Sequence, residues 1–246
     1  MNTNSLRLKK KFQITSADTD MHSRLKISAL ANYLIQAAIS SAEQLDFGFE
    51  TLKKDNLFWV LNRLTIEVYR PLKWSEIAEV ETWPKNLERI FYIRDFIVRD
   101  NQGDIVAKAT SAWLSIDIKS KRPGLFKGDK IKAFSALNNL HALNYSPLKL
   151  GPTQKDSAIQ ITPSYFDIDL NKHVTSTRYI DWMMDQFSLD FHKNNYPNHL
   201  SINYMKETMC NEKIDMGFES QASKNSFEGF NADQAKVAFR GQIDFA

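Results

Sequence analysis

The stretch DIDLNKHV, residues 167–174, places two carboxylates, an amide and an imidazole within seven residues. Alternate residues of an extended or turning segment share one side, so these polar side chains are expected to lie together. An apolar-periodic run follows at residues 179–187, which is typical of a helix. We therefore expect the chemically active end of the protein at a turn just before this helix. The polar side chains are Asp167, Asp169, Asn171 and His173.

An earlier stretch, DTDMHSRL at residues 18–25, repeats this arrangement of acidic residues in front of an apolar-periodic helix. The two helices start in register, because Leu30 falls over Tyr179 when the acidic pairs are aligned. Upstream, the sequence QIT recurs at residues 13–15 and 160–162, and this match requires a short insertion in the second copy. Such internal repetition predicts a duplicated unit of structure.

The two copies differ in the residues that could carry out chemistry. The first copy has His22 and Arg24 where the second has Asn171 and His173. An arginine is permanently charged, whereas an imidazole can gain and lose a proton near neutral pH. We therefore predict that the second copy is chemical and that the first copy serves binding.

Apolar periodicity predicts a long helix followed by an antiparallel sheet in the first half. A helical stripe runs from Ile27 to Leu45 and indicates burial on one side. The pattern then changes to alternation, and a hairpin loop at residues 100–104 joins two long strands. The predicted strands cover residues 58–69, 78–82, 90–99 and 105–117.

Together these patterns predict an α+β fold in which each half is a long helix wrapped by a curved antiparallel sheet. We expect the first domain at residues 1–133 and the second at residues 158–246. Residues 134–157 carry turn residues and little periodicity, so they are predicted to be a linker that runs over the surface.

Composition limits the classes of function. The chain has 246 residues with 32 Lys and Arg against 29 Asp and Glu, and a net charge of +3 does not indicate nucleic-acid binding. The single cysteine, Cys210, cannot form an intramolecular disulfide, which fits a reducing compartment. Residues 1–11 lack the apolar core of a secretory signal, and no apolar run reaches the length of about 18 residues that a membrane span needs. We expect a soluble, cytoplasmic protein.

The second half is similar to a known enzyme family. DLNKHV at residues 169–174, followed by RYIDW at residues 178–182, resembles the Asp-x-Asn-x-His-Val motif and following helix of the acyl-acyl-carrier-protein thioesterases. Downstream, Tyr204 and Glu207 resemble that family's strand in which a catalytic glutamate stands three residues after a tyrosine. The resemblance runs from about residue 11 to the end and includes FWVL at residues 58–61.

The resemblance implies a tandem hotdog fold that hydrolyses a fatty acyl-acyl-carrier-protein to a free fatty acid and the carrier protein. Such a reaction needs donors for the developing oxyanion and a base for the attacking water. Glu207 is assigned as the base and Asn171 as the group that positions the reactants. His173 is assigned as polariser or proton shuttle, and Asp169 as the residue that orients its neighbours, although the roles of Asp169 and Glu207 could be exchanged. The N-terminus of the helix after His173 offers further donors for the oxyanion.

The chain departs from the family at one position near this site. A cysteine often follows the catalytic glutamate in the family, but here that position is Thr208. Cys210 lies two residues further on and out of register. We therefore expect an activated water, and not a cysteine, to attack the thioester.

The resemblance also implies an apolar tunnel for the acyl chain in the first half and an acidic carrier protein as partner. Helix and strand residues of the first half are candidates for the tunnel, although plain core packing also explains them. A dense basic stretch could dock the carrier, with a solvated linker as the alternative. The tunnel candidates are Leu30, Leu34, Trp59 and Leu61, and the docking candidates are Lys119, Lys121, Arg122 and Lys127.

Several alternatives stay open at this point. An acyl-CoA thioesterase and a hydratase are other hotdog enzymes, and an acyl-binding regulator is a non-enzymatic option. A regulator usually carries an output module, and only about eleven residues precede the first predicted strand. No spacing of His, Cys and Asp is typical of a metal site, so we expect neither a metal nor a cofactor. A tandem hotdog supplies within one chain the pairing that single hotdogs achieve as dimers, which leaves both a monomer and a homodimer open.

Overall fold

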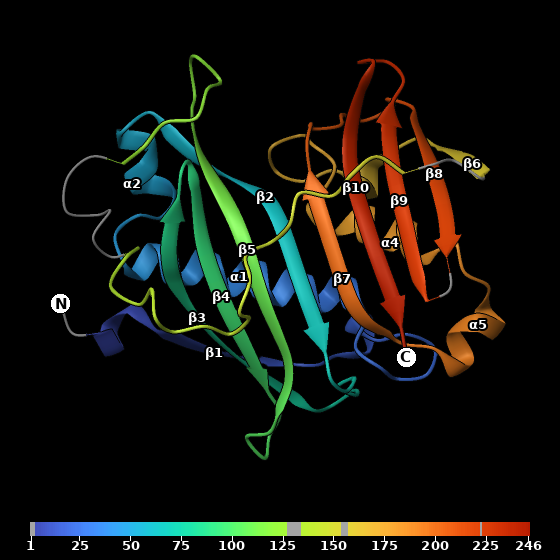
Figure 1. Ribbon diagram of the computed structural model, residues 1–246, viewed down its shortest axis with the longest axis horizontal. Helices are drawn as coiled ribbons and strands as arrows, with labels where there is room; N and C mark the ends of the chain where they lie inside the picture. Colours follow the sequence, from blue (N-terminus) through green and yellow to red (C-terminus); the bar gives the residue numbers. More distant parts are fainter. Residues whose placement is uncertain (1–2, 127–133, 154–156, 222) are drawn as a thin grey trace. The chain divides into compact units, whose positions relative to one another are not determined.

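The computed structural model describes residues 3–126, 134–153, 157–221 and 223–246, and it divides into two compact units (Figure 1). The first unit is Met1–Pro147 and the second is Leu148–Ala246. The division therefore falls inside the segment 134–157 that the sequence predicts to be a linker.

The first unit consists of a long helix, α1 (Ile27–Gln44), packed against an antiparallel sheet with the strand order β1-β3-β4-β5-β2. The shorter helices are η1 (Thr3–Leu6), η2 (Ser16–Asp18) and α2 (Phe49–Lys54). The strands are β1 (Leu8–Gln13), β2 (Leu57–Val68), β3 (Ile77–Glu88), β4 (Phe91–Arg99) and β5 (Ile105–Asp117).

The predicted helix and strands of the first half are confirmed, with one strand longer than expected. The apolar stripe of α1 is buried, and Leu34 has no exposed surface at all. β3 continues to Glu88, whereas the alternation in the sequence indicates an end near residue 82. The alternation in the sequence stops early because the pairing of β3 with β4 shifts register between Pro84 and Asn86. Proline donates no hydrogen bond to a sheet, so the strand continues past this point with an irregular pattern.

The second unit repeats this architecture, with the strand order β6-β8-β9-β10-β7 (Figure 1). Each strand takes the place of its counterpart in the first unit, so the predicted duplication and the α+β fold are confirmed. The helix that corresponds to α1 has only nine residues, however, and is not the long helix predicted for this half. The helices are η3 (Tyr165–Asp167), α4 (Ser176–Met184) and α5 (Leu189–Asn194). The strands are β6 (Ser157–Ile161), β7 (Pro197–Tyr204), β8 (Ile214–Gln221), β9 (Lys224–Asn231) and β10 (Lys236–Phe245).

The helix α4 packs closely onto its own sheet. Tyr179, Trp182 and Met183 are buried, and the Tyr179 ring lies 4.9 Å from the ring of Phe239 on β10. A Cβ atom on Gly241 of β10 would lie 2.1 Å from the sulfur of Met183. A side chain at this position would therefore require the end of the Met183 side chain to move.

The two copies align without the insertion that the QIT match requires. Thr15 and Ser164 occupy the same place, because each begins a 3-10 turn whose last residue, Asp18 or Asp167, hydrogen-bonds back to it. The QIT match is therefore wrong by two residues. Short alternating strands resemble one another closely, so their sequences alone specify register weakly.

Residues 134–147 pack against the first unit, which corrects the prediction that the whole linker runs over the surface. Lys85 and Asp95 form a buried ion pair at 3.0 Å, and both bind the segment through its backbone. The Lys85 ammonium donates to the carbonyl of Leu143 at 3.1 Å, and the Asp95 carboxylate accepts from the amide of Ala142 at 2.8 Å. The first unit therefore extends beyond the predicted limit at residue 133.

No helix in the described part of the chain is both long enough and apolar enough to cross a membrane.

Candidate active site

The second unit folds the stretch 169–173 into a tight turn. The Asp169 amide donates to the His173 carbonyl at 2.8 Å, and Lys172 takes the left-handed conformation with φ of 66°. One carboxylate oxygen of Asp169, Oδ1, accepts from the amides of Asn171 at 2.8 Å and His173 at 3.2 Å. An aspartate that bonds its own downstream backbone in this way fixes a turn. Asp169 therefore holds the backbone of both neighbours, while the Asn171 side chain is exposed and His173 is half-buried.

The first unit contains the same turn with different chemistry. Oδ1 of Asp20 accepts from the amides of His22 at 2.8 Å and Arg24 at 2.9 Å, and Ser23 has φ of 60°. Here, however, the guanidinium of Arg24 folds back and binds the other carboxylate oxygen of Asp20 at 2.8 Å. The first copy therefore has the shape of the active turn without a free acid–base group at the position of His173.

A loop after β7 brings Glu207 to the turn. β7 ends at Tyr204, so Glu207 lies in a loop. The family resemblance predicts a strand at this position instead. The carbonyl of Thr208 accepts from the amide of Val174 at 2.8 Å, and Met209 forms a β-bridge with His173. These contacts hold the residues that directly follow Glu207 against the turn, so that segments distant in sequence become neighbours.

Glu207 is an ionised, partly exposed carboxylate. Its side chain is 44% exposed and forms an ion pair with the ammonium of Lys206. Burial raises the pKa of Glu207, but the hydrogen bond and charge of Lys206 and the charge of His173 outweigh burial, so the pKa lies below its ordinary value. The carboxylate is therefore ionised at neutral pH and open to water, as a base requires.

Two further polar side chains, Thr208 and Cys210, belong to this loop. Thr208 is fully buried, and its hydroxyl has no hydrogen-bond partner within the described chain. Cys210 is exposed, and its sulfur lies 3.8 Å from the carbonyl of Pro163. Among residues 3–126, 134–153, 157–221 and 223–246, no three His, Cys, Asp or Glu side chains are grouped as metal ligands.

The helix α4 begins directly after the turn. No side chain caps its first turn, and its N-cap residue, Thr175, donates its amide to the carbonyl of Asp167 at 2.8 Å. The hydroxyl of Tyr204 donates to the carbonyl of Ser176 at 2.9 Å, which ties the helix start to the end of β7. The N-terminus of a helix presents amide donors and a positive partial charge. It can therefore stabilise a developing oxyanion near His173.

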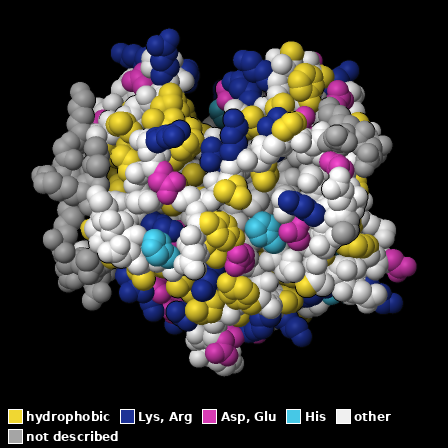
Figure 2. Space-filling view, in the orientation of Figure 1, with side chains coloured by type: hydrophobic (Ala, Val, Ile, Leu, Met, Phe, Trp, Pro, Cys, Tyr) yellow, Lys and Arg dark blue, Asp and Glu magenta, His cyan; other side chains and the backbone are white. Residues whose placement is uncertain are grey.

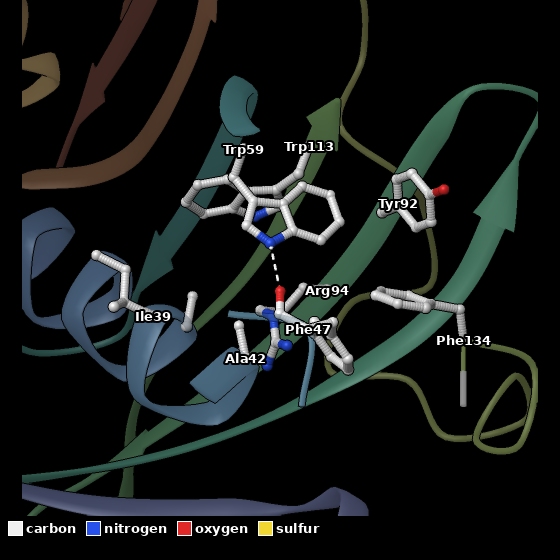
Figure 3. Close-up of a pocket in the computed structure, with 9 residues that line it drawn as sticks. Ile39, Ala42, Phe47, Trp59, Tyr92, Arg94, Trp113 and Phe134 are labelled. Carbon is white, nitrogen blue, oxygen red and sulfur yellow. Dashed lines mark hydrogen bonds between the residues drawn. The ribbon is translucent and has the colours of Figure 1, made fainter. Parts of the chain in front are cut away.

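The first unit contains an apolar pocket beside α1, which Figure 3 shows in close-up. The pocket has a cavity volume of about 50 Å³, within about 380 Å³ of space that includes open solvent. Of the four predicted tunnel residues only Trp59 lines it, and its indole N–H donates to the carbonyl of Phe47 at 2.9 Å. The other three are buried in the core and do not line this pocket. The lining residues are Ala38, Ile39, Ala42, Phe47, Trp59, Tyr92, Arg94, Trp113 and Phe134.

Arg94 is the charged residue in this otherwise apolar lining. Its guanidinium is buried and donates to the hydroxyls of Ser41 at 2.9 Å and Thr82 at 3.2 Å. Burial lowers the pKa of Arg94 to about 9, so the group stays protonated at neutral pH. Hydroxyl oxygens hold the charge here in place of a carboxylate, which keeps the rest of the pocket wall apolar.

The predicted docking residues lie in the turn that follows β5. Lys119, Lys121 and Arg122 are exposed, and Figure 2 shows Lys and Arg side chains at this end of the first unit. The Lys121 ammonium lies 5.4 Å from the centre of the Phe58 ring. Lys127 lies outside the described residues.

Sequence reasoning missed most of the pocket. Phe47, Tyr92 and Phe134 come from a loop, a strand and the predicted linker, and their rings pack around one another. No periodic pattern connects these segments. The only hint in the sequence is that aromatic residues stand at the edges of apolar runs. Such residues do not by themselves distinguish the lining of a pocket from a packed core.

Comparison with known proteins shows similarity along almost the whole chain. Residues 5–133 match the family model of the acyl-ACP thioesterase N-terminal domain, and residues 151–244 match that of the C-terminal domain. Oleoyl-acyl carrier protein thioesterase 2 of Arabidopsis thaliana is 27% identical over 84% of this chain and 61% of its own length. Palmitoyl-acyl carrier protein thioesterase of Gossypium hirsutum is 28% identical over 80% of this chain and 51% of its own length. The chain thus spans less than two thirds of these curated relatives.

Two solved structures are similar over their full extent. An acyl-ACP thioesterase from Bacteroides thetaiotaomicron superposes with a TM-score of 0.87 at 25% identity and covers 100% of both chains. The 12:0-ACP thioesterase from Umbellularia californica superposes with a TM-score of 0.83 at 21% identity and covers 98% of this chain and 97% of its own. The second likeness concerns the fold alone.

Proposed function

Because this chain belongs to the acyl-acyl-carrier-protein thioesterase family, we propose that it hydrolyses a fatty acyl-acyl-carrier-protein to a free fatty acid and the carrier protein, and so ends chain elongation. The observation that supports the proposal is that the loop carrying the ionised, partly exposed Glu207 is bridged to the turn carrying His173. The names of the relatives, which specify oleoyl and palmitoyl chains on acyl carrier protein, support a fatty acyl substrate.

The first step is attack by water. The water oxygen bonds to the carbonyl carbon of the thioester while Glu207 takes one of its protons. The carbonyl oxygen becomes an oxyanion, which accepts hydrogen bonds from the Asn171 side chain or from the first-turn amides of α4. His173, on the turn that contacts the Glu207 loop, polarises the same carbonyl or the water.

The second step releases the carrier. The oxyanion reforms the carbonyl and the carbon–sulfur bond breaks. The thiolate takes a proton either directly from protonated Glu207 or from His173, which then recovers a proton from Glu207. The products are a carboxylic acid and a thiol, so the atoms of one water molecule are fully accounted for. No cysteine takes part in either step, and Cys210 has no assigned role.

Asp169 is assigned as the residue that fixes the turn, and Glu207 as the base. The reason is that one oxygen of Asp169 already accepts two backbone amides, at 2.8 and 3.2 Å. Using Asp169 as a base would weaken the bonds that hold Asn171 and His173 in place. This assignment chooses between the two alternatives that the sequence leaves open.

We assign the pocket of the first unit to the acyl chain, because its wall is almost wholly apolar. Ala42→Leu fills part of the pocket and is expected to lower kcat/KM for the longest accepted chain about 10-fold relative to shorter chains. Ile39→Ala enlarges the pocket from the same helix and is expected to shift the preference toward longer chains. Profiles from octanoyl to octadecanoyl carrier substrates measure both shifts. An equal loss for all chain lengths in both variants would contradict the assignment.

We assign the exposed basic turn after β5 to docking of the acidic carrier protein. The double variant Lys119→Glu with Arg122→Glu is expected to raise KM for acyl-carrier substrate roughly 10-fold, because charge complementarity guides association. KM for the same acyl group on coenzyme A should stay constant. Lys121 is left intact, because it takes a left-handed backbone conformation and packs on Phe58.

The matched control for this experiment is charge reversal at Lys53 and Lys54, two exposed residues on α2. The control changes the net charge by the same amount at another place on the first unit. A rise in KM of equal size for acyl-carrier and acyl-CoA substrates would remove the docking role from this turn.

The function itself is tested by incubating the purified chain with acyl-carrier substrates and measuring free thiol. Release of thiol supports hydrolysis, and parallel assays with acyl-CoA and with an enoyl substrate separate the other hotdog activities. Thiol release from acyl-CoA alone, or hydration of the enoyl substrate without thiol release, would reject the proposal. A cytoplasmic location and a monomeric or homodimeric state stay predictions from the sequence.

A further inference from the structure

A partly buried network of polar groups holds the loop that carries Glu207. The carboxylate oxygen Oε2 of Glu212 accepts from the Met209 amide at 2.7 Å, the Asn231 side chain at 2.8 Å and the Gln234 side chain at 2.9 Å. The same Gln234 amide group donates to the backbone carbonyl of Glu207 at 3.1 Å. Asn231 has no exposed surface. Glu212 thus connects the loop to the end of β9 and, through Gln234, to Glu207 itself.

The same loop contacts the turn that presents His173. Thr208 accepts from Val174, and Met209 is bridged to His173. A displacement of the loop would therefore change the position of Glu207 relative to His173. Misplacement of a reacting group by about 1 Å can reduce a rate about 10²-fold.

The first unit shows what this network looks like without a catalytic group. Backbone bonding places Arg70 at the position of Lys206, because their amides donate to the equivalent carbonyls of Val106 and Ala238. Glu76 stands at the position of Glu212 and accepts from the Lys73 amide at 2.6 Å, as Glu212 accepts from Met209.

The cations of the two copies have different partners. In the first unit, Arg70 binds both Glu76, at 3.4 Å, and Asp100 at the end of β4. In the second unit, Asn231 replaces the aspartate and donates directly to Glu212. An amide and a carboxylate need no cation between them, so Lys206 is available to pair with Glu207.

The two copies also differ at the position of the proposed base. Pro71 follows Arg70 at the place where Glu207 follows Lys206. The first copy therefore has the equivalent loop and the glutamate that holds it, Glu76, but it has no carboxylate at the position of Glu207. The loop-holding glutamate can be substituted in either copy. Only the substitution of Glu212 affects a loop that carries the proposed base.

We propose that Glu212, together with Asn231 and Gln234, is a positioning residue that holds Glu207 against His173 in the geometry for water activation. This inference rests on the proposed function. Glu212 does not touch the reacting atoms, and its effect passes through the loop.

The test compares Glu212→Ala and Glu212→Gln with Glu76→Ala, the matched removal in the first copy. Glu212→Ala is expected to lower kcat about 10-fold or more with KM changed less than about 3-fold, because the loop that carries the base is displaced. Glu212→Gln keeps one oxygen for Met209 and Asn231, so its kcat should fall between those of the wild type and Glu212→Ala. Glu76→Ala should lower the melting temperature about as much as Glu212→Ala does. Its kcat should nevertheless stay within about 2-fold of that of the wild type.

Three results would overturn the inference. The first is a kcat for both Glu212 variants within about 2-fold of the wild type, and the second is an equal loss of kcat in Glu76→Ala. The third is a loss that lies wholly in KM. If Glu212→Ala does not fold, the Glu212→Gln variant decides the question alone. Wild type and Glu207→Gln are measured in the same assay. If the wild type releases no thiol, the proposed thioesterase function has failed, and the positioning role of Glu212 is not what failed.

Discussion

Glu207→Gln is expected to reduce kcat for acyl-carrier hydrolysis about 10³-fold. The amide has the size of the carboxylate but cannot take a proton from water. It also loses the ion pair with Lys206, which lies on the surface and contributes little to stability. Release of carrier thiol under saturating substrate measures kcat, and thermal unfolding checks that the fold is intact.

The control for this substitution is Glu79→Gln on β3. Glu79 also pairs with lysines, Lys9 at 3.3 Å and Lys11 at 3.6 Å, but it belongs to the first unit's sheet. Loss of its charge should leave kcat unchanged. Wild-type turnover by Glu207→Gln would refute the role of Glu207 as base and return Asp169 as the candidate.

His173→Ala is expected to lower kcat about 10²-fold, because it removes the group that polarises the reactants or returns a proton to the leaving thiolate. The turn itself should persist, since Asp169 binds the backbone amide and not the ring of His173. The melting temperature should therefore stay within about 4 °C of the wild type. Single-turnover thiol release measures the chemical step directly.

The duplication provides the matched control, Arg24→Ala. Arg24 occupies the position of His173 in the equivalent turn and binds Asp20 through its guanidinium. Its removal should destabilise the first unit's turn and leave kcat unchanged. If His173→Ala and Arg24→Ala lowered kcat equally, the effect of His173 would be structural and not catalytic.

Local patterns account for the parts of the fold that the sequence predicts well. The stripe of α1 and the alternation of β2, β4 and β5 reflect burial of one face, which depends on neighbours close in sequence. The error in β3 arises at Pro84, where a register shift interrupts the alternation. The linker prediction was too wide because the backbone of Ala142 and Leu143 binds a buried ion pair that no local pattern reveals.

The sequence by itself determined the duplicated fold and the turn at Asp169, because helices, strands and aspartate turns follow from residues that are near one another along the chain. Resemblance to a family also predicted His173 and Glu207 as catalytic residues. Tertiary structure alone decided that Glu207 lies in a loop against His173 and that Glu212 holds this loop through Asn231 and Gln234. It also decided which aromatic side chains enclose the pocket. These arrangements depend on contacts between distant segments, and the packing of such contacts has no periodic signature in the sequence.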